Sequence, residues 1–173
     1  MNKKIIVAIV GKSGSGKTVL SKRLKEFADI PYICSYTTRP MRNGEIDGVE
    51  HIFLPQDTVI PKKEDMLAYA YFGGYHYWAL HSQVDDIVTY VIDEKALVDM
   101  IESFSDRYDI IKVYVDRSDI NVDEERMNRD NDRVIMDEQF YDIIIRNNCN
   151  YSDFINDRTL ELWKFIKEFI IWQ

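Results

Sequence analysis

The segment "GKSGSGKT", residues 11–18, decides how this sequence folds. It follows the apolar, β-branched run "KIIVAIV" at residues 4–10 and precedes a stretch with helical periodicity. The pattern G-x-x-x-x-G-K-[ST] between a strand and a helix is typical of a phosphate-binding loop, whose backbone N–H groups surround phosphate oxygens near the helix N-terminus. We therefore predict that ATP binds to all residues of this loop: Gly11, Lys12, Ser13, Gly14, Ser15, Gly16, Lys17 and Thr18.

The loop also predicts a magnesium site. Lys17 is expected to reach the β- and γ-phosphates, and the Thr18 hydroxyl is expected to ligate Mg²⁺. Asp93 follows another apolar run, and an acidic residue at a strand end holds Mg²⁺-bound water in many NTPases. Capping of the following helix explains Asp93 almost equally well, so both interpretations stay open.

The composition indicates a folded, single-domain protein. Of the 173 residues, 46% are hydrophobic and 13% are aromatic. The net charge of −8 argues against a nucleic-acid partner, which requires a basic face. Cys34 and Cys149 give neither a disulfide framework nor metal-ligand spacing, which suits a reducing compartment. No apolar run has the length of a membrane span or of a signal peptide, so we expect a cytoplasmic protein without a membrane partner.

Apolar runs alternate with helical patterns along most of the chain, which predicts an α/β fold of the P-loop NTPase type with a parallel sheet flanked by helices. The expected strands are residues 4–10, 30–34, 87–92, 110–115 and 142–146, and the expected helices are residues 17–28, 93–104, 119–128, 132–140 and about 156–172. Residues 36–86 break this rhythm, since they are polar at first and then rich in aromatics. We interpret them as an insertion with small β elements of its own.

A second anion site is predicted in "SYTTRPMRNGEIDGVEHIF", residues 35–53. Arg39 and Arg42 follow the expected second strand, and that end of a parallel strand faces the same crevice as the phosphate loop. Two planar guanidinium groups suit a phosphomonoester dianion, with Glu45 and Asp47 available to hold them. The alternative is a solvated charged loop, which is the usual explanation for an isolated Arg-x-x-Arg.

This stretch resembles the signature of the guanylate kinase family, in which Thr-Ser/Thr-Arg-Pro is followed by a basic residue, an acidic residue, Gly and Tyr or His. The resemblance implies one domain with a core at residues 1–35 and 87–173, a monophosphate-binding insertion at about 36–86 and a lid at about 117–134. It also implies that Ser35 touches the acceptor base. The residues implied at the acceptor phosphate are Arg39, Arg42, His51 and Tyr77, with Glu45 beside them.

Two further parts of the family's site are implied later in the chain. The segment "ERMNRDNDR" resembles the arginine-bearing lid, so Arg126, Arg129 and Arg133 are candidate catalytic residues beside Lys17 and Arg39. A charged helix face is the other interpretation of these arginines. Asn147 matches the family's asparagine near the adenine of ATP.

The resemblance breaks where the family reads guanine. Guanine presents N–H donors, for which a carboxylate is the natural acceptor, but Ala68 occupies the position of the family's Glu. Ala79 replaces a Ser or Thr, and Val91 stands where an Asp is expected. Residues that could supply the missing acceptor are Glu64, Asp65, Tyr69 and Tyr71.

The function implied is Mg-ATP-dependent phosphoryl transfer to a nucleoside monophosphate, GMP or dGMP, giving ADP and the diphosphate. The substitutions at Ala68 and Ala79 keep open another nucleotide or a phosphorylated metabolite as acceptor. A non-catalytic binding module is a further alternative, against which the intact Lys17 argues. The apolar C-terminal residues Ile170, Ile171 and Trp172 suggest either packing on the sheet or a homodimer contact.

Overall fold

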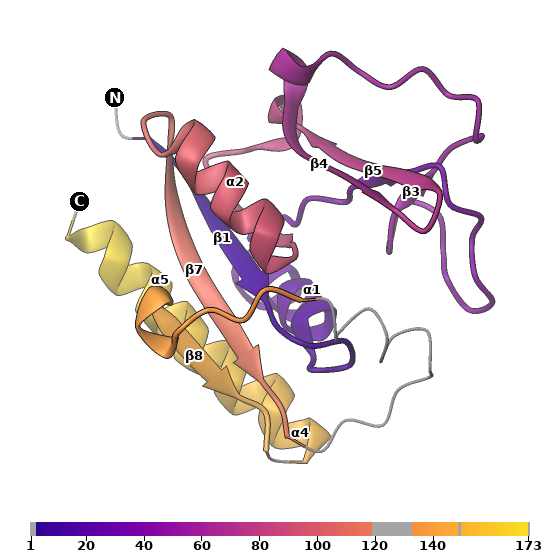
Figure 1. Ribbon diagram of the computed structural model, residues 1–173. Helices are drawn as coiled ribbons and strands as arrows, with labels where there is room; N and C mark the ends of the chain where they lie inside the picture. Colours follow the sequence, from indigo (N-terminus) through magenta and orange to yellow (C-terminus); the bar gives the residue numbers. More distant parts are fainter. Residues whose placement is uncertain (1–2, 119–132, 149, 173) are drawn as a thin grey trace. The chain divides into compact units, whose positions relative to one another are not determined.

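The computed structural model describes residues 3–118, 133–148 and 150–172. The chain divides into two compact units, one formed by residues 1–32 and 86–173 and the other by residues 33–85. Each unit has its own β-sheet, and Figure 1 shows the elements of both.

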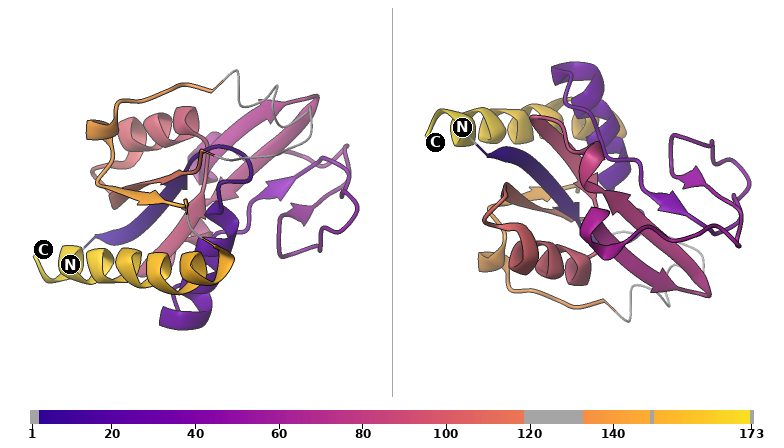
Figure 2. Two further views of the ribbon diagram at one scale, coloured as in Figure 1. Left: turned by 90° about the horizontal axis from the view of Figure 1, so that it is seen from below. Right: turned by 90° about the horizontal axis from the view of Figure 1, so that it is seen from above.

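The first unit contains a four-stranded parallel sheet in the order β6-β1-β7-β8, which confirms the predicted α/β fold. Its elements are β1 (Lys4–Val10), α1 (Lys17–Ala28), β6 (Ile87–Val91), α2 (Glu94–Phe104), β7 (Tyr108–Asp116), η3 (Glu138–Phe140), β8 (Ile143–Arg146), α4 (Tyr151–Asp153), the π-helical turn η4 (Phe154–Arg158) and α5 (Thr159–Ile171). In Figure 2, α2 lies on one side of this sheet and α5 on the other. The residues after β1, β6, β7 and β8 therefore share one edge of the sheet, which is where parallel sheets bind ligands.

The core of this unit lies between the sheet and helices α1 and α5. The β-branched residues of β1 alternate between the two faces, and those at positions 5, 7 and 9 face α1 and α5. The buried side chains of this core are Ile5, Val7, Ile9, Leu20, Leu24, Ile30, Ile111, Val113, Val115, Ile145, Phe154, Leu162 and Ile166. This packing fixes both ends of the phosphate loop, because the loop joins β1 directly to α1.

Two predicted elements of this unit are wrong. The expected strand at residues 30–34 makes a single bridge, from Tyr32 to Thr89, because Pro31 has no N–H with which to extend a ladder. The expected helix at residues 132–140 is only the short η3 in its described part, residues 133–140. Aromatic packing explains the difference, since the Tyr141 ring stacks on Tyr114 and the ammonium group of Lys112 lies over the Phe140 ring. The expected helix at residues 119–128 lies entirely outside the described residues.

The second unit is a small mixed sheet in the order β3-β2-β5-β4. Its elements are β2 (Tyr36–Thr37), β3 (Ile52–Phe53), η1 (Lys63–Asp65), β4 (Met66–Phe72), β5 (Tyr75–Leu80) and η2 (His81–Gln83). Strands β4 and β5 form a hairpin, with a register shift between Met66 and Ala68. Arg39 and Arg42 thus follow a strand of this second sheet, not a strand of the parallel sheet as predicted.

Candidate active site

The phosphate loop leaves β1 through Gly11 and enters α1 after Gly16. Both glycines have positive φ angles, 145° at Gly11 and 107° at Gly16, which other residues rarely adopt. A Cβ on Gly11 would lie 2.4 Å from the carbonyl oxygen of Val115 in β7. The loop is therefore shaped by backbone freedom and by contact with the neighbouring strand.

Lys17 lies over its own loop. Its Nζ donates hydrogen bonds to the carbonyl oxygens of Gly11 and Lys12, each at 2.7 Å. The Thr18 side chain is exposed in the first turn of α1. The Ser15 hydroxyl is buried and has no hydrogen-bond partner within the described residues. A lysine ammonium, an exposed hydroxyl and an unpaired buried hydroxyl in one loop fit an anionic ligand with a bound cation.

Asn147 contacts the phosphate loop from the end of β8. Its side chain is buried, and its Nδ2 donates to the carbonyl oxygen of Ser15 at 2.7 Å. The predicted proximity to adenine stays a prediction, but the contact with the loop is a role that the sequence did not indicate. Phe154 is a second residue whose contact with the loop the sequence did not indicate. A Cβ on Gly16 would lie 2.7 Å from atoms of the Phe154 ring.

Two further candidates of the first unit, Asp93 and Arg133, lie near the same sheet edge. Asp93 caps α2, since its Oδ1 accepts a hydrogen bond from the Ala96 N–H at 2.8 Å. Arg133 forms an ion pair with Glu94, in which Nε donates to Oε2 at 3.0 Å and Nη2 donates to Oε1. The Glu94 and Arg133 side chains are largely buried, so Arg133 anchors its segment to α2. Arg126 and Arg129 lie outside the described residues.

In the second unit, Glu45 holds the predicted arginine pair together. Arg39 donates from Nη1 to Glu45 Oε2 at 3.0 Å and from Nη2 to Oε1 at 2.8 Å. Glu45 Oε2 also accepts from the backbone N–H of Arg42 at 2.7 Å. Burial opposes the charge of the Glu45 carboxylate, but the bonds from Arg39 and Arg42 outweigh it and lower the pKa of Glu45 below its usual range. The guanidinium of Arg39 lies 5.3 Å from the centre of the Phe53 ring.

Thr37 at the end of β2 and Thr38 directly after it position Arg39. The Thr37 hydroxyl accepts from the Arg39 N–H at 3.1 Å and donates to the carbonyl oxygen of His76 at 3.0 Å. The Thr38 hydroxyl accepts from the His76 N–H at 3.0 Å. Both threonines are buried, so they attach the arginine-bearing loop to β5. The sequence motif contains both threonines but indicated no role for them.

His51 joins the same cluster. Its Nδ1 lies 3.0 Å from the Ser35 hydroxyl, and its ring packs edge-on against Tyr77 and Phe53, with centroids 5.8 Å apart in each case. Burial, followed by the positive charge of Arg39, lowers the pKa of His51 below its usual value. Ser35, Arg39, Arg42, Glu45, His51 and Tyr77 are thus linked in this unit by the contacts described.

The lowered pKa of His51 predicts a pH-dependent stability. The folded chain keeps His51 neutral, whereas the unfolded chain protonates it near pH 6.5. The unfolded state therefore binds more protons, and the stability contributed by neutral His51 is present above this pH and is lost as the pH falls. We expect the melting temperature to fall more between pH 7.5 and pH 5.5 in the wild type than in His51→Asn. His81→Gln serves as the control. An equal pH dependence in wild type and His51→Asn would contradict the prediction.

The pairing of β4 with β5 shows on which face of the hairpin the positions predicted to read the base lie. Ala79 pairs with Ala68, and Tyr77 pairs with Ala70. Because paired residues share a face and alternate residues point to the same side, these four side chains lie on one face of the hairpin. That face presents methyl groups beside Tyr77 where a carboxylate and a hydroxyl were expected.

Two of the alternative base acceptors lie on the other face. Tyr69 and Tyr71 alternate with Ala68 and Ala70 along β4. The Tyr69 hydroxyl lies 2.8 Å from Nδ1 of His76, and the Tyr71 and His76 ring centres are 4.9 Å apart. The two tyrosines therefore lie on the face opposite Ala68 and Tyr77, and their role as acceptors for the base stays a prediction. Glu64 and Asp65 belong to the exposed η1 turn that precedes β4.

Comparisons with known proteins show the family of this chain. A family model described as guanylate kinase matches residues 2–161. The chain belongs to the guanylate kinase family. A guanylate kinase of Lawsonia intracellularis is 42% identical over 74 residues, which cover 41% of this chain and 35% of the relative. A guanylate kinase of Fusobacterium nucleatum is 34% identical over 83 residues, which cover 47% of this chain and 45% of the relative.

The alignments with these curated guanylate kinases span less than half of their length. The crystal structure of guanylate kinase from Anaplasma phagocytophilum matches with a TM-score of 0.58 and 18% identity, covering 97% of this chain and 87% of the other. That likeness supports the fold. Together with the family model, it confirms the resemblance of residues 35–53 and the phosphate loop to the guanylate kinase family.

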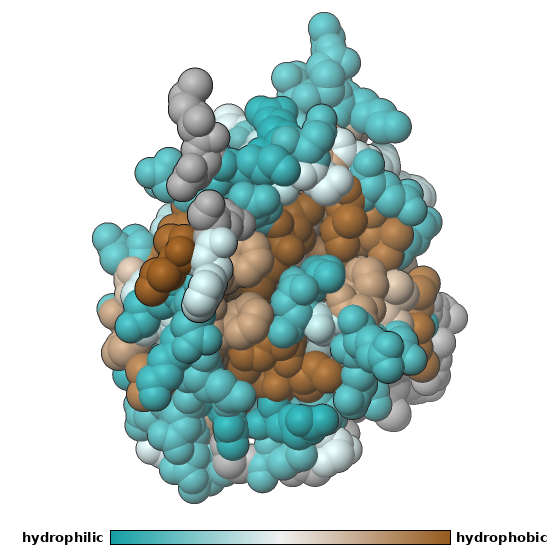
Figure 3. All heavy atoms as spheres, turned by 90° about the vertical axis from the view of Figure 1, so that its left-hand side faces the viewer, coloured by the Kyte–Doolittle hydropathy of each residue, from teal (hydrophilic) through white to brown (hydrophobic). Residues whose placement is uncertain are grey.

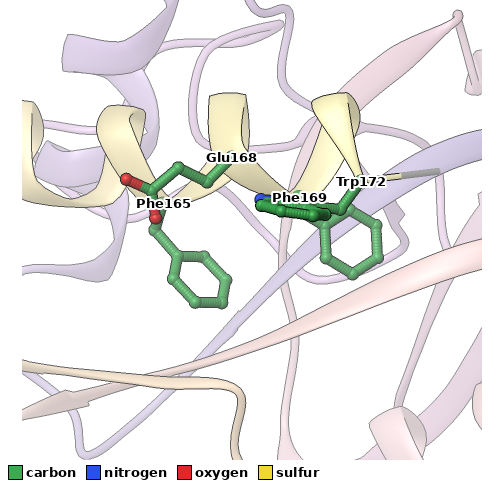
Figure 4. A pocket seen from close by; sticks show the side chains of 4 residues that line it. All are labelled: Phe165, Glu168, Phe169 and Trp172. Atoms are coloured by element: carbon green, nitrogen blue, oxygen red, sulfur yellow. The ribbon is translucent and has the colours of Figure 1, made fainter.

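The C-terminal helix carries an apolar surface of its own. Figure 3 shows one face of the molecule, on which hydrophobic side chains gather among hydrophilic ones. A groove of about 330 Å³ is lined by Phe165, Glu168 and Phe169 of α5 and by Trp172, which directly follows the helix (Figure 4). The homodimer contact at this end stays a prediction. Within the described residues, no helix combines the length and the apolar character that crossing a bilayer requires.

Proposed function

We propose that this chain transfers the γ-phosphoryl group of Mg-ATP to a nucleoside monophosphate, with GMP or dGMP as the acceptor. The observation that carries the proposal is that one chain holds two separate groups of cationic side chains, each of which would suit an anion. One is the phosphate loop with Lys17, and the other is the Arg39 cluster with Glu45 and His51. A protein that only binds or hydrolyses ATP has no use for the second group.

The chain's residues would act by binding and alignment. Lys17 would leave the carbonyl oxygens of its own loop and bind the β- and γ-phosphates. Arg39 and Arg42 would hold the acceptor phosphate, which is already anionic and needs no general base. The neutral ring of His51 would add a hydrogen bond without a further charge. Residues 33–85 would form the acceptor-binding part of the site.

Magnesium fits the residues at the sheet edge. The Thr18 hydroxyl is exposed beside the loop, and Asp93 is exposed at the end of β6, which pairs with β1. These two residues would hold the ion, with Asp93 acting through water while it caps α2. When bound, the ion neutralises charge on the phosphate oxygens. Arg126 and Arg129, which belong to the expected lid, would add positive charge beside the transferring phosphoryl group, whereas Arg133 is paired with Glu94.

An assay of ADP release tests the proposal. Mg-ATP would be offered with each ribo- and deoxynucleoside monophosphate in turn, and hydrolysis without acceptor would be subtracted. We expect turnover with GMP or dGMP. ATP hydrolysis that no monophosphate stimulates would overturn the proposal. Turnover with another base only would establish the second candidate, a different acceptor, which the methyl groups of Ala68 and Ala79 favour.

Because Ala68 and Tyr77 share one face of the hairpin, a substitution at Ala68 is expected to change which acceptor base the protein prefers. Ala68→Glu would place a carboxylate on this face, where it can accept hydrogen bonds from guanine. Bonds to a charged group contribute about 1.5–3 kcal/mol each, so we expect kcat/KM for GMP relative to AMP to rise about tenfold or more. Competition assays with both nucleotides measure this ratio. Tyr71→Glu, on the opposite face, is the control. An equal gain in both variants would contradict the register-based prediction.

A further inference from the structure

The phosphate loop is contacted by residues that follow both β7 and β8. Arg117 donates to the carbonyl oxygen of Gly14 at 3.4 Å, and Asn147 donates to that of Ser15 at 2.7 Å. The backbone N–H of Asn147 donates to the carbonyl oxygen of Asp116 at 2.7 Å, so Asn147 is itself fixed to the end of β7. Its side chain is 6% exposed, and its amide is thus held in one place.

We propose that Asn147 is a positioning residue that orients the phosphate loop to bind the triphosphate of ATP, a role separate from any contact with adenine. In a trans peptide unit the C=O and N–H bonds point in opposite directions. Asn147 holds the Ser15 carbonyl toward itself, and the N–H of Gly16 in the same peptide unit therefore points to the other side. A loop that binds phosphate needs its N–H groups turned toward the anion and its carbonyls turned away.

Phe154 supports the same peptide from a second direction. A Cβ on Gly16 would lie 2.7 Å from two atoms of the Phe154 ring and 3.0 Å from Nδ2 of Asn147. Phe154 is 2% exposed and begins the π-helical turn η4 between α4 and α5. Such turns insert an extra residue and shift side-chain directions, and they are frequent at functional sites. Gly16 is thus enclosed by the ring and the amide, which leaves little room for another loop conformation.

The inference rests on the proposed function, because that function supplies ATP as the ligand. Inorganic tripolyphosphate has no adenine, so its binding reports on the phosphate loop alone. Calorimetry would measure the binding of tripolyphosphate, ATP and GTP to the wild type, Asn147→Asp and Asn147→Ala. A buried carbonyl left without its hydrogen bond destabilises the loop conformation that binds phosphate, so we expect about 10- to 100-fold weaker binding. The factor should be similar for all three ligands, and the ratio of ATP to GTP affinity should not change.

Asn148→Asp is the matched control. It adds the same charge one residue later, at an exposed side chain whose Oδ1 accepts from the Ser118 hydroxyl at 3.3 Å. We expect its tripolyphosphate affinity to stay within about threefold of the wild type. Should the Asn147 variants fail to fold, Phe154→Leu and Phe154→Ala test the same peptide. Phe154→Ala is expected to weaken tripolyphosphate binding, and Phe154→Leu is expected to retain most of it.

Three results would overturn the inference. Unchanged tripolyphosphate binding with weaker ATP binding would make Asn147 an adenine-binding residue only. Unchanged binding of all three ligands in folded Asn147 variants would remove any role. If the wild type bound neither ATP nor tripolyphosphate, both the inference and the proposed function would be overturned. If the Asn147 variants lost affinity for all three ligands by a similar factor, but the wild type phosphorylated no acceptor, the inference would be supported and only the proposed function would be overturned.

Discussion

Replacing Lys17 by alanine is expected to lower kcat for phosphoryl transfer by about 100- to 1,000-fold. The Lys17 ammonium group already lies over the loop, bonded to the carbonyl oxygens of Gly11 and Lys12. Binding of a phosphate lets it exchange these neutral acceptors for charged oxygens, which adds a direct attraction between opposite charges. As charge moves between phosphate groups in the transition state, the lysine stays in contact with it. Alanine removes this contact and leaves the backbone cradle in place.

The measurement is ADP release at saturating monophosphate, together with ATP binding by calorimetry. Lys25→Ala is the control, since Lys25 is another lysine of α1 and pairs with Asp29 on the surface. That variant is expected to keep nearly full activity. If Lys17→Ala retained more than about a tenth of the wild-type kcat, the assignment of this loop to phosphoryl transfer would be wrong.

Sequence patterns predicted the part of the fold that depends on local periodicity. The buried run at residues 4–10 and the helix at residues 17–28 have the predicted bounds, because the phosphate-loop pattern marks both ends. Strands that alternate with helices along the chain pair in parallel, so the α/β fold class was also predictable. The family model confirms the resemblance that was based on residues 35–53.

The errors arose where tertiary contacts outweigh local preference. The expected strand at residues 30–34 needed backbone donors that Pro31 lacks, and the expected helix at residues 132–140 is displaced by stacking of Tyr141 on Tyr114. The contact of Asn147 with Ser15 joins residues 132 positions apart, which no periodicity encodes. The separate sheet of residues 33–85 was likewise foreseen only as small β elements, since its strands β2 and β3 have two residues each.

Arg39→Ala is expected to raise KM for the acceptor monophosphate by about 100-fold or more, while KM for ATP stays nearly constant. The Arg39 side chain is 8% exposed, and Glu45 takes up two of its N–H groups in a bidentate pair. Burial opposes the positive charge, but the bonds to Glu45 outweigh it and raise the pKa of Arg39 above its ordinary value. The group is therefore a permanent, oriented cation, and losing two charged hydrogen bonds to a phosphate costs about 3 kcal/mol or more.

Arg39→Lys separates the effect of charge from that of geometry. Lysine keeps the positive charge but lacks the planar fork that binds both a carboxylate and a phosphate oxygen pair. We expect its KM for the acceptor to rise about tenfold, between the wild type and the alanine variant. Lys62→Ala is the control within the same unit, since it removes a cation from an exposed side chain. A loss in Lys62→Ala as large as in Arg39→Ala would indicate general electrostatic attraction instead of a site.

A double variant excludes misfolding as the cause. Arg39→Ala leaves the Glu45 carboxylate, whose side chain is 18% exposed, without its partner, and removing one member of a buried pair costs about 3–5 kcal/mol of stability. Arg39→Ala/Glu45→Ala removes the unpaired charge as well, so its melting temperature should recover toward that of the wild type. Its KM for the monophosphate should stay as high as in Arg39→Ala, because the cation is still missing. Recovery of both quantities together would mean that Arg39 supports only the local fold, and the acceptor phosphate would have to bind elsewhere.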